Sequence, residues 1–314
     1  MNRLLNLVLA VVLFSLFGCV KILNDELETK ETKLVLNATI APDSVFAVNL
    51  SHTFNIFADE SNKNLPFVND AKVKLFENET YVADLVNIGY GYYINPDYYP
   101  QTGKEYRVEA SYKNYKSINS TAVIPTPVEI TDFDTTQIFS TDPYSGGKNI
   151  EYIGIIKYND PPNIKNFYQL SCRLSVTDED GKTYWNEQSI WSLENDYQFF
   201  DAHYKGTLAW DDKYIDGKET TIRFSFYSIY NYKELRVRNT QTIHFVFYLK
   251  SITEDYFTYI KTANLFWESG GGEDPFAEPV VIYSNIENGY GIFGGYASDT
   301  AVLNITFNYE GGVK

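Results

Sequence analysis

Histidine, cysteine and methionine are scarce in this chain of 314 residues. It contains three histidines, two cysteines and one methionine. The histidines, His52, His203 and His244, lie far apart, and none has the spacing of a zinc motif. Once Cys19 is assigned to the N-terminal signal described below, Cys172 has no partner, so we expect no disulfide. Cys172 lies in an alternating strand pattern and is predicted to be a small buried side chain. These shortages favour neither a histidine metal site nor a cysteine nucleophile.

The motifs of common enzyme classes are also missing. The chain has no Gly-x-Ser-x-Gly elbow, phosphate-binding loop or dinucleotide fingerprint. Three acidic groups offer oxygen ligands for calcium, but none follows the EF-hand order, and turn formation explains the same residues. They are Asp178-Glu179-Asp180, Asp211-Asp212 with Asp216, and Glu273-Asp274 with Glu278. We predict no enzyme, metal or cofactor, while a hydrolase stays an alternative because a carboxylate pair for glycoside hydrolysis is set by the fold.

Positive charge is in short supply. The chain has 26 lysines and arginines against 41 aspartates and glutamates, which gives a formal net charge of −15. A protein of this charge repels the phosphate backbone of nucleic acids. We therefore predict that nucleic acid is not a partner.

The first eighteen residues have the three parts of an export signal. Arg3 forms a short basic region, an apolar run follows over residues 4–14, and Ser15 and Gly18 are the small residues of a cleavage region. The apolar run is shorter than the roughly 20 residues of a membrane span, and no later stretch is long and apolar enough. We predict a signal peptide over residues 1–18.

Leu16-Phe17-Gly18-Cys19 resembles the bacterial lipobox, in which a cysteine after a small residue is acylated on sulfur. We predict that Cys19 is lipidated and that residues 19–31 form a tether, which makes the protein membrane-anchored. Acidic residues from Asp25 onward loosely resemble the surface-export signal of Bacteroidota lipoproteins, and an ordinary solvated tether has the same composition. The expected location is the outer membrane, facing the cell exterior.

Aromatic residues are abundant. They make up 17% of the chain, with 27 tyrosines and 21 phenylalanines. These residue types favour pleated, half-buried surfaces, so the composition predicts a large amount of sheet. Tyrosine also provides contact area at binding surfaces, which is the alternative use of this excess.

Short alternating segments with turns between them occupy residues 32–127. They predict an immunoglobulin- or fibronectin-like β-sandwich. The turn Gly103-Lys104-Glu105 before Tyr106 is typical of a tyrosine corner, and Pro125-Thr126-Pro127 marks the end of the domain. The predicted strands are 33–41, 45–51, 72–76, 81–87, 91–94, 105–112 and 116–123.

Residues 128–314 predict a larger β-rich domain with one helix. An Asp-Gly turn at Asp180-Gly181 is a hairpin signal. Ser251 and Glu254 have the spacing of a capping box, and a helical pattern then continues to Gly270. The clearest predicted strands are 150–158, 167–177, 222–229, 242–250, 280–283 and 302–309.

The block from Asp274 to Tyr296, DPFAEPVVIYSNIENGYGIFGGY, resembles the C-terminal signature of the family catalogued as domain of unknown function 4249. The lipobox, the opening strand at Lys33 and the Pro125-Thr126-Pro127 break resemble features of this family and occur in the same order. The family's members are Bacteroidota lipoproteins. The resemblance implies an outer-membrane setting beside TonB-dependent transporters and carries no activity.

The glycine-rich part of this block is the candidate functional loop, and a tight turn between strands is the alternative. Its candidate residues are Asn288, Gly289, Tyr290, Gly291, Phe293 and Tyr296. Three functional hypotheses follow from the sequence. The first is a non-enzymatic lipoprotein that assists a TonB-dependent transporter or binds its cargo, the second is a stand-alone glycan-binding or adhesion lipoprotein, and the third is the hydrolase mentioned above.

Overall fold

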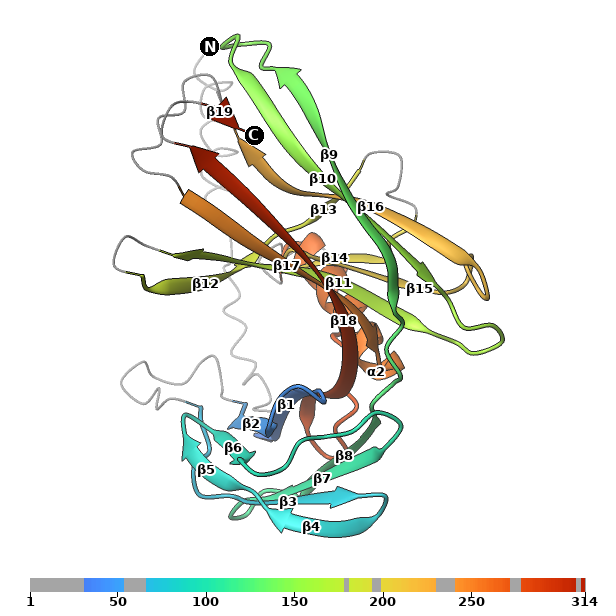
Figure 1. Ribbon diagram of the computed structural model, residues 1–314. Helices are drawn as coiled ribbons and strands as arrows, with labels where there is room; N and C mark the ends of the chain where they lie inside the picture. The colour runs from blue at the N-terminus through green and yellow to red at the C-terminus, as the bar shows by residue number, and fades with distance from the viewer. Residues whose placement is uncertain are drawn as a thin grey trace, which may run out of the picture.

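The computed structural model describes residues 31–53, 66–177, 181–193, 199–229, 241–271, 278–308 and 312–313. The predicted signal peptide, Cys19 and the tether up to residue 30 lie outside these residues, as do Asp178-Glu179-Asp180 and Glu273-Asp274. The described part is mostly β, as predicted, and forms two lobes (Figure 1). It contains no helix with the length and apolarity of a membrane span.

The first lobe is a two-sheet sandwich. One sheet has the order β4-β3-β7-β8, and the facing sheet has the order β1-β2-β6-β5. The strands are β1 (Leu34–Ile40), β2 (Phe46–His52), β3 (Lys72–Glu77), β4 (Thr80–Asp84), β5 (Val86–Gly89), β6 (Tyr92–Asn95), β7 (Glu105–Ser111) and β8 (Ile118–Val123). The predicted strand 81–87 is two strands, because the chain changes sheets at Leu85, whose N–H donates to the Val73 carbonyl at 2.8 Å.

Two tyrosines fix the loops of this lobe. Tyr106 is fully buried, and its hydroxyl accepts a hydrogen bond from the Gln101 N–H at 2.8 Å, five residues upstream. This is the geometry of a tyrosine corner, so that prediction is confirmed. Tyr93 is equally buried, and its hydroxyl bridges the Val68 carbonyl and the Ala71 N–H. In both cases the hydroxyl satisfies loop backbone groups in the apolar interior.

The second lobe is a larger sandwich. Its first sheet runs β14-β15-β11-β17-β18, with β12 beside β11, and its second runs β13-β16-β10-β9. The strands are β9 (Ile130–Thr141), β10 (Lys148–Asn159), β11 (Phe167–Thr177), β12 (Thr183–Gln188), β13 (Trp191–Ser192), β14 (Ala202–Tyr204), β15 (Thr207–Asp211), β16 (Glu219–Ile229), β17 (Gln241–Ile252), β18 (Tyr290–Asn308) and β19 (Gly312–Val313). The core between the sheets is rich in aromatic rings, among them Trp210, Phe224 and Phe247. Much of the aromatic excess is therefore structural.

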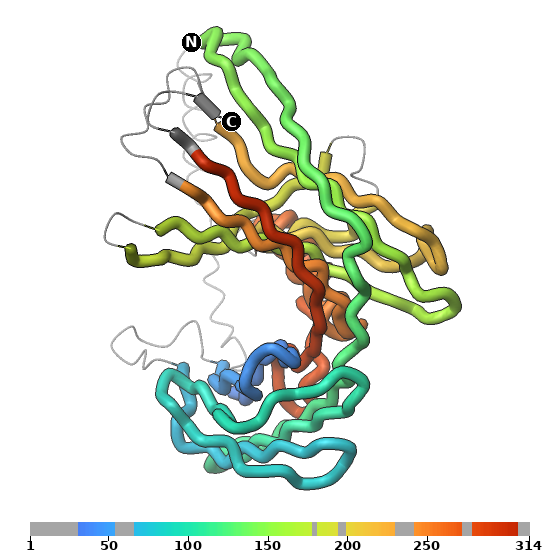
Figure 2. The backbone as a smooth tube through the Cα atoms, in the orientation of Figure 1, coloured from blue at the N-terminus to red at the C-terminus, as the bar shows by residue number. Residues whose placement is uncertain are grey.

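A single strand joins the lobes. The first part of β18 pairs in parallel with β1, from Val35 opposite Tyr290 to Ile40 opposite Gly295. From Tyr296 onward the same strand pairs antiparallel with β17. Figure 2 shows this strand, in dark red, running from the lower lobe into the upper one. The first sandwich thus extends beyond the predicted segment 32–127, because a strand from the far end of the chain completes its sheet.

The helix α2 (Glu254–Glu268) covers the outer face of the large sheet, with Phe257 and Ile260 packed against Phe167. The predicted capping box is wrong. Ser251 is still in β17, opposite Tyr168 and Ala297, and Thr253 is the cap whose side chain accepts from the Tyr256 N–H. The predicted strand 280–283 is also wrong, because these residues have no strand partner and run along the helix.

Candidate functional site

A crevice of about 610 Å³ lies where the two lobes meet. The first lobe contributes Thr121 and Val123 of β8, and the second contributes Phe167 and the first turn of α2. The crevice is bordered by the connection between the lobes, because Thr253, which lines it, donates its N–H to the Gly295 carbonyl of β18 at 3.0 Å. A crevice of this volume between two domains is a common location for ligand binding.

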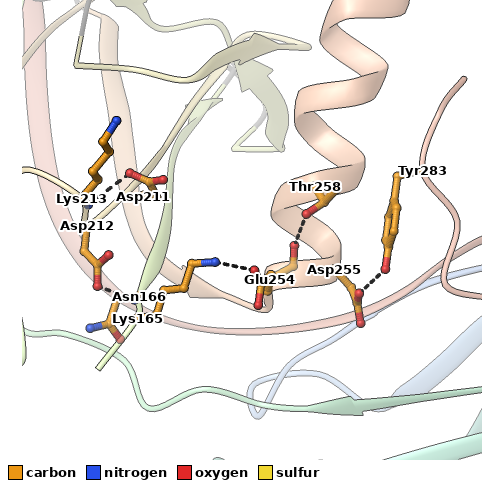
Figure 3. A network of polar contacts seen from close by, with 9 residues as sticks. All are labelled: Lys165, Asn166, Asp211, Asp212, Lys213, Glu254, Asp255, Thr258 and Tyr283. Carbon is orange, nitrogen blue, oxygen red and sulfur yellow. Dashed lines mark hydrogen bonds and ion pairs between the residues drawn. The ribbon is translucent and has the colours of Figure 1, made fainter. Parts of the chain in front are cut away.

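Lys165 and Glu254 form an ion pair on one side of the crevice, with 2.5 Å between Nζ and Oε1 (Figure 3). Both side chains are mostly exposed, at 61% and 62%. An exposed pair of this kind adds little to stability. Either side chain can therefore leave this ion pair and bind a ligand with little loss of stability.

Asp255 is held on the other side. It accepts hydrogen bonds from the Tyr283 hydroxyl and from Asn285 Nδ2, the latter at 3.2 Å. The bond to Asp255, together with burial, raises the pKa of Tyr283 to about 12. Asn285 in turn bonds both backbone groups of Phe293, at 2.7 and 2.9 Å. The helix start, the segment before β18 and β18 itself are thus connected through one carboxylate.

A second polar cluster lies beside β11 and β15. Asp160, Asp212 and Asp216 offer carboxylate oxygens within 4.8 Å of one another, and the first two are buried. The sequence had grouped Asp212 and Asp216 but not Asp160, which lies over 50 residues earlier, so no spacing rule could find it.

Hydrogen bonds inside the protein already engage these carboxylates. Asp160 accepts from the Tyr168 hydroxyl and the Gly217 N–H, and Asp212 accepts from the Asn166 N–H at 2.6 Å. Burial raises the pKa of Asp212 despite that hydrogen bond. We read the three aspartates as a clamp between the 160–166 and 211–218 loops.

A comparison with known protein families finds a match that covers most of the chain. The model of a domain of unknown function, DUF4249, matches residues 20–301 and therefore spans both lobes. The chain belongs to the DUF4249 family. It matches no curated protein.

The glycine-rich part of the signature block of this DUF4249 chain, residues 288–296, lies where β18 joins the two lobes. Asn288 and Gly289 form the turn before β18, Tyr290 and Gly291 pair with β1, and Phe293 is fully buried in the first core. A Cβ on Gly291 would lie 2.0 Å from the Leu36 carbonyl oxygen, and φ there is +109°. The glycine is thus required by a close strand approach.

Tyr296 is the point at which β18 changes partner in the DUF4249 chain. The centroid of its ring lies 4.8 Å from the Lys250 ammonium, and the ring centroid of Tyr248 lies 5.9 Å from the same ammonium. Burial raises the pKa of Tyr296 to about 12 and lowers the pKa of Lys250. Among the described residues, Lys250 has no carboxylate partner in an ion pair.

The remaining candidates of the DUF4249 sequence lie apart from the crevice. Cys172 is 1% exposed in the second core, and burial raises the pKa of its thiol, so it is the buried side chain predicted. His52 is in β2, His203 in β14 and His244 in β17, where it bonds Asn304. The crevice residues offer carboxylates, hydroxyls and one lysine beside the apolar side chains of Val123 and Phe167, an arrangement suited to binding.

Proposed function

We propose that the chain is a lipid-anchored binding protein of the outer membrane, facing the exterior and working beside a TonB-dependent transporter, with no enzymatic role. The observation that carries the binding role is the crevice between two lobes joined by one strand. Because β18 is continuous hydrogen-bonded structure in both lobes, the crevice walls are held in a fixed relation. A preformed site avoids the cost of ordering its walls on binding.

The charges of the crevice suggest the kind of cargo. Glu254 and Asp255 outnumber Lys165, and the whole chain carries −15. Such a site attracts cationic or hydroxyl-rich cargo and repels anions. The lipobox at Cys19 supports the membrane anchor, and the setting beside transporters is what the family resemblance implies.

A pull-down from native outer membranes in mild detergent tests the partner. The tagged protein should recover a TonB-dependent transporter in stoichiometric amount, and Cys19→Ala should lose it together with the membrane fraction. Val123→Trp fills the crevice from an exposed position on β8 and should reduce recovery of cargo. Val86→Trp, at another exposed valine of the same lobe, is the control. Recovery of the lipoprotein alone from membranes in which it is abundant would refute the transporter role.

Glycan binding without a transporter is the second candidate. It is favoured by Trp185 of β12, whose side chain is 50% exposed on this strand. Exposed aromatic rings are typical of surfaces that bind sugars or proteins. Binding of purified protein to polysaccharide in a glycan array, lost in Trp185→Ala, would support this candidate.

A further inference from the structure

A second cavity lies at the side of the larger sandwich, away from the crevice. It measures about 450 Å³ and opens between β9 of one sheet and β18 of the other. Phe139 faces it from β9, and Leu303 and Ile305 face it from β18. Phe139 is 60% exposed, so an apolar ring that a closed sandwich would cover is open to solvent here.

Tyr152 of β10 lines this cavity and is 4% exposed. Its ring packs near Phe226 and Tyr227, with centroids 6.1 and 6.0 Å away. The hydroxyl is buried and has no hydrogen-bond partner within the described part of the chain. A buried hydroxyl without a partner is costly, and such groups in native proteins call for an explanation.

The chemistry of the walls limits what fits. Besides the three apolar residues, the cavity is lined by uncharged polar residues such as Thr135 and Gln137, and none of its described lining residues is charged. Burial keeps the pKa of Tyr152 above its ordinary value, so its hydroxyl stays a protonated donor at neutral pH. A ligand with a charge would be desolvated here without a counter-charge.

We propose that this cavity binds a neutral molecule that places a carbonyl or hydroxyl oxygen on the Tyr152 hydroxyl and an apolar portion between β9 and β18. The volume lies within the range of small-molecule sites. The site is separate from the crevice and does not depend on the function proposed for it.

Binding of octanamide tests the proposal, with octanoate and octylammonium as charged probes of the same chain length. The protein is the complete chain after residue 18 carrying Cys19→Ala, and binding is followed by calorimetry and saturation-transfer NMR. Octanamide should saturate one site, and each charged probe should bind at least about tenfold more weakly. Equal binding of octanoate and octanamide, or no saturable binding of octanamide, would overturn the proposal.

Three variants separate a ligand site from a packing defect. Tyr152→Phe should weaken octanamide about 3- to 10-fold without lowering the melting temperature, because it removes only the unpaired hydroxyl. Gln137→Trp, at an exposed position of β9, should abolish binding by filling the cavity. Tyr227→Phe alters a neighbouring tyrosine that does not line the cavity and should bind as the wild type does. Unchanged affinity in Tyr152→Phe would count against the proposal.

Discussion

The two lobes are both β-sandwiches, yet they are completed in different ways. The first lobe has a core of aliphatic and aromatic side chains, and it relies on residues 290–295 of β18 to extend its sheet beside β1. The second lobe builds both of its sheets from residues after Ile130 and fills the space between them with aromatic rings. The first lobe depends on the second for a strand, and the reverse is not true.

Buried tyrosines of the two lobes also differ in whether the hydroxyl has a partner. In the first, Tyr93 and Tyr106 are buried with their hydroxyls bonded to loop backbone. In the second, Tyr152 is buried with its hydroxyl unpaired at the floor of a cavity. Tyr93 and Tyr106 are thus loop anchors, whereas Tyr152 is a candidate ligand contact. Tyr152 also differs from Tyr168 of its own lobe, whose buried hydroxyl donates to Asp160.

The largest effect is expected at the shared strand. Gly291→Ala should cost about 3 kcal/mol or more, because it adds a Cβ 2.0 Å from the Leu36 carbonyl oxygen at a strongly positive φ. Hydrogen exchange should show the loss first in β1 and β2. Gly103→Ala is the control, since φ is also positive there but no atom lies within 4 Å of the added Cβ, and it should cost only about 1 kcal/mol. Equal losses in the two variants would mean that β18 is not what completes the first lobe.

A smaller effect is expected from removing single hydroxyls. Tyr106→Phe should lower the free energy of unfolding by about 1–2 kcal/mol, because the Gln101 N–H loses its partner inside the protein. Tyr152→Phe should leave it unchanged or slightly higher in the absence of ligand. Urea denaturation of both variants measures the difference, and similar losses would contradict the contrast between the lobes.

Lys250→Met should raise the melting temperature by about 2 °C or more at neutral pH. The charged ammonium is partly buried between Tyr248 and Tyr296, and its pKa is lowered in the folded protein. Between the lowered and the ordinary pKa the unfolded chain binds more protons, so wild-type stability should rise with pH and the variant's advantage should shrink. Lys213→Met, at an exposed lysine 4.9 Å from the Tyr214 ring centroid, is the control and should change little.

The smallest effect is expected at the aspartate clamp. Burial raises the pKa of Asp212, so its ionised form destabilises the fold as pH rises through that pKa. Asp212→Asn keeps an oxygen for the Asn166 N–H and should stabilise the protein slightly at pH 7, with no gain at pH 3. The melting temperature of the wild type should be the same with EDTA and with added calcium. A stabilisation of the wild type by calcium that Asp212→Asn loses would instead show that the cluster is a metal site.

The sequence predicted most strands and the tyrosine corner because these depend on local alternation and on turn residues near Tyr106. It missed β9, whose residues are mostly exposed and show little alternation, and it placed the helix cap at Ser251 two residues early. The candidate sites were harder, because Asp160 meets Asp212 and Val123 meets Asp255 only through the fold. The glycine-rich block was noticed for its composition, but that its glycines serve close strand contact depends on β1, more than 200 residues away.

The parallel pairing of β1 with β18 also sets an order of events during folding. Val35 precedes its partner Tyr290 by more than 250 residues in the chain, so it is synthesised well before Tyr290. Pairing of such distant segments closes a long loop and is slow. The second lobe has its own cores and can form first, whereas the first lobe stays one strand short until the start of β18 has been synthesised. The first lobe is therefore completed only after β18 has been made, and until then the open edge of β1 is a place where a chaperone or another copy of the chain can pair.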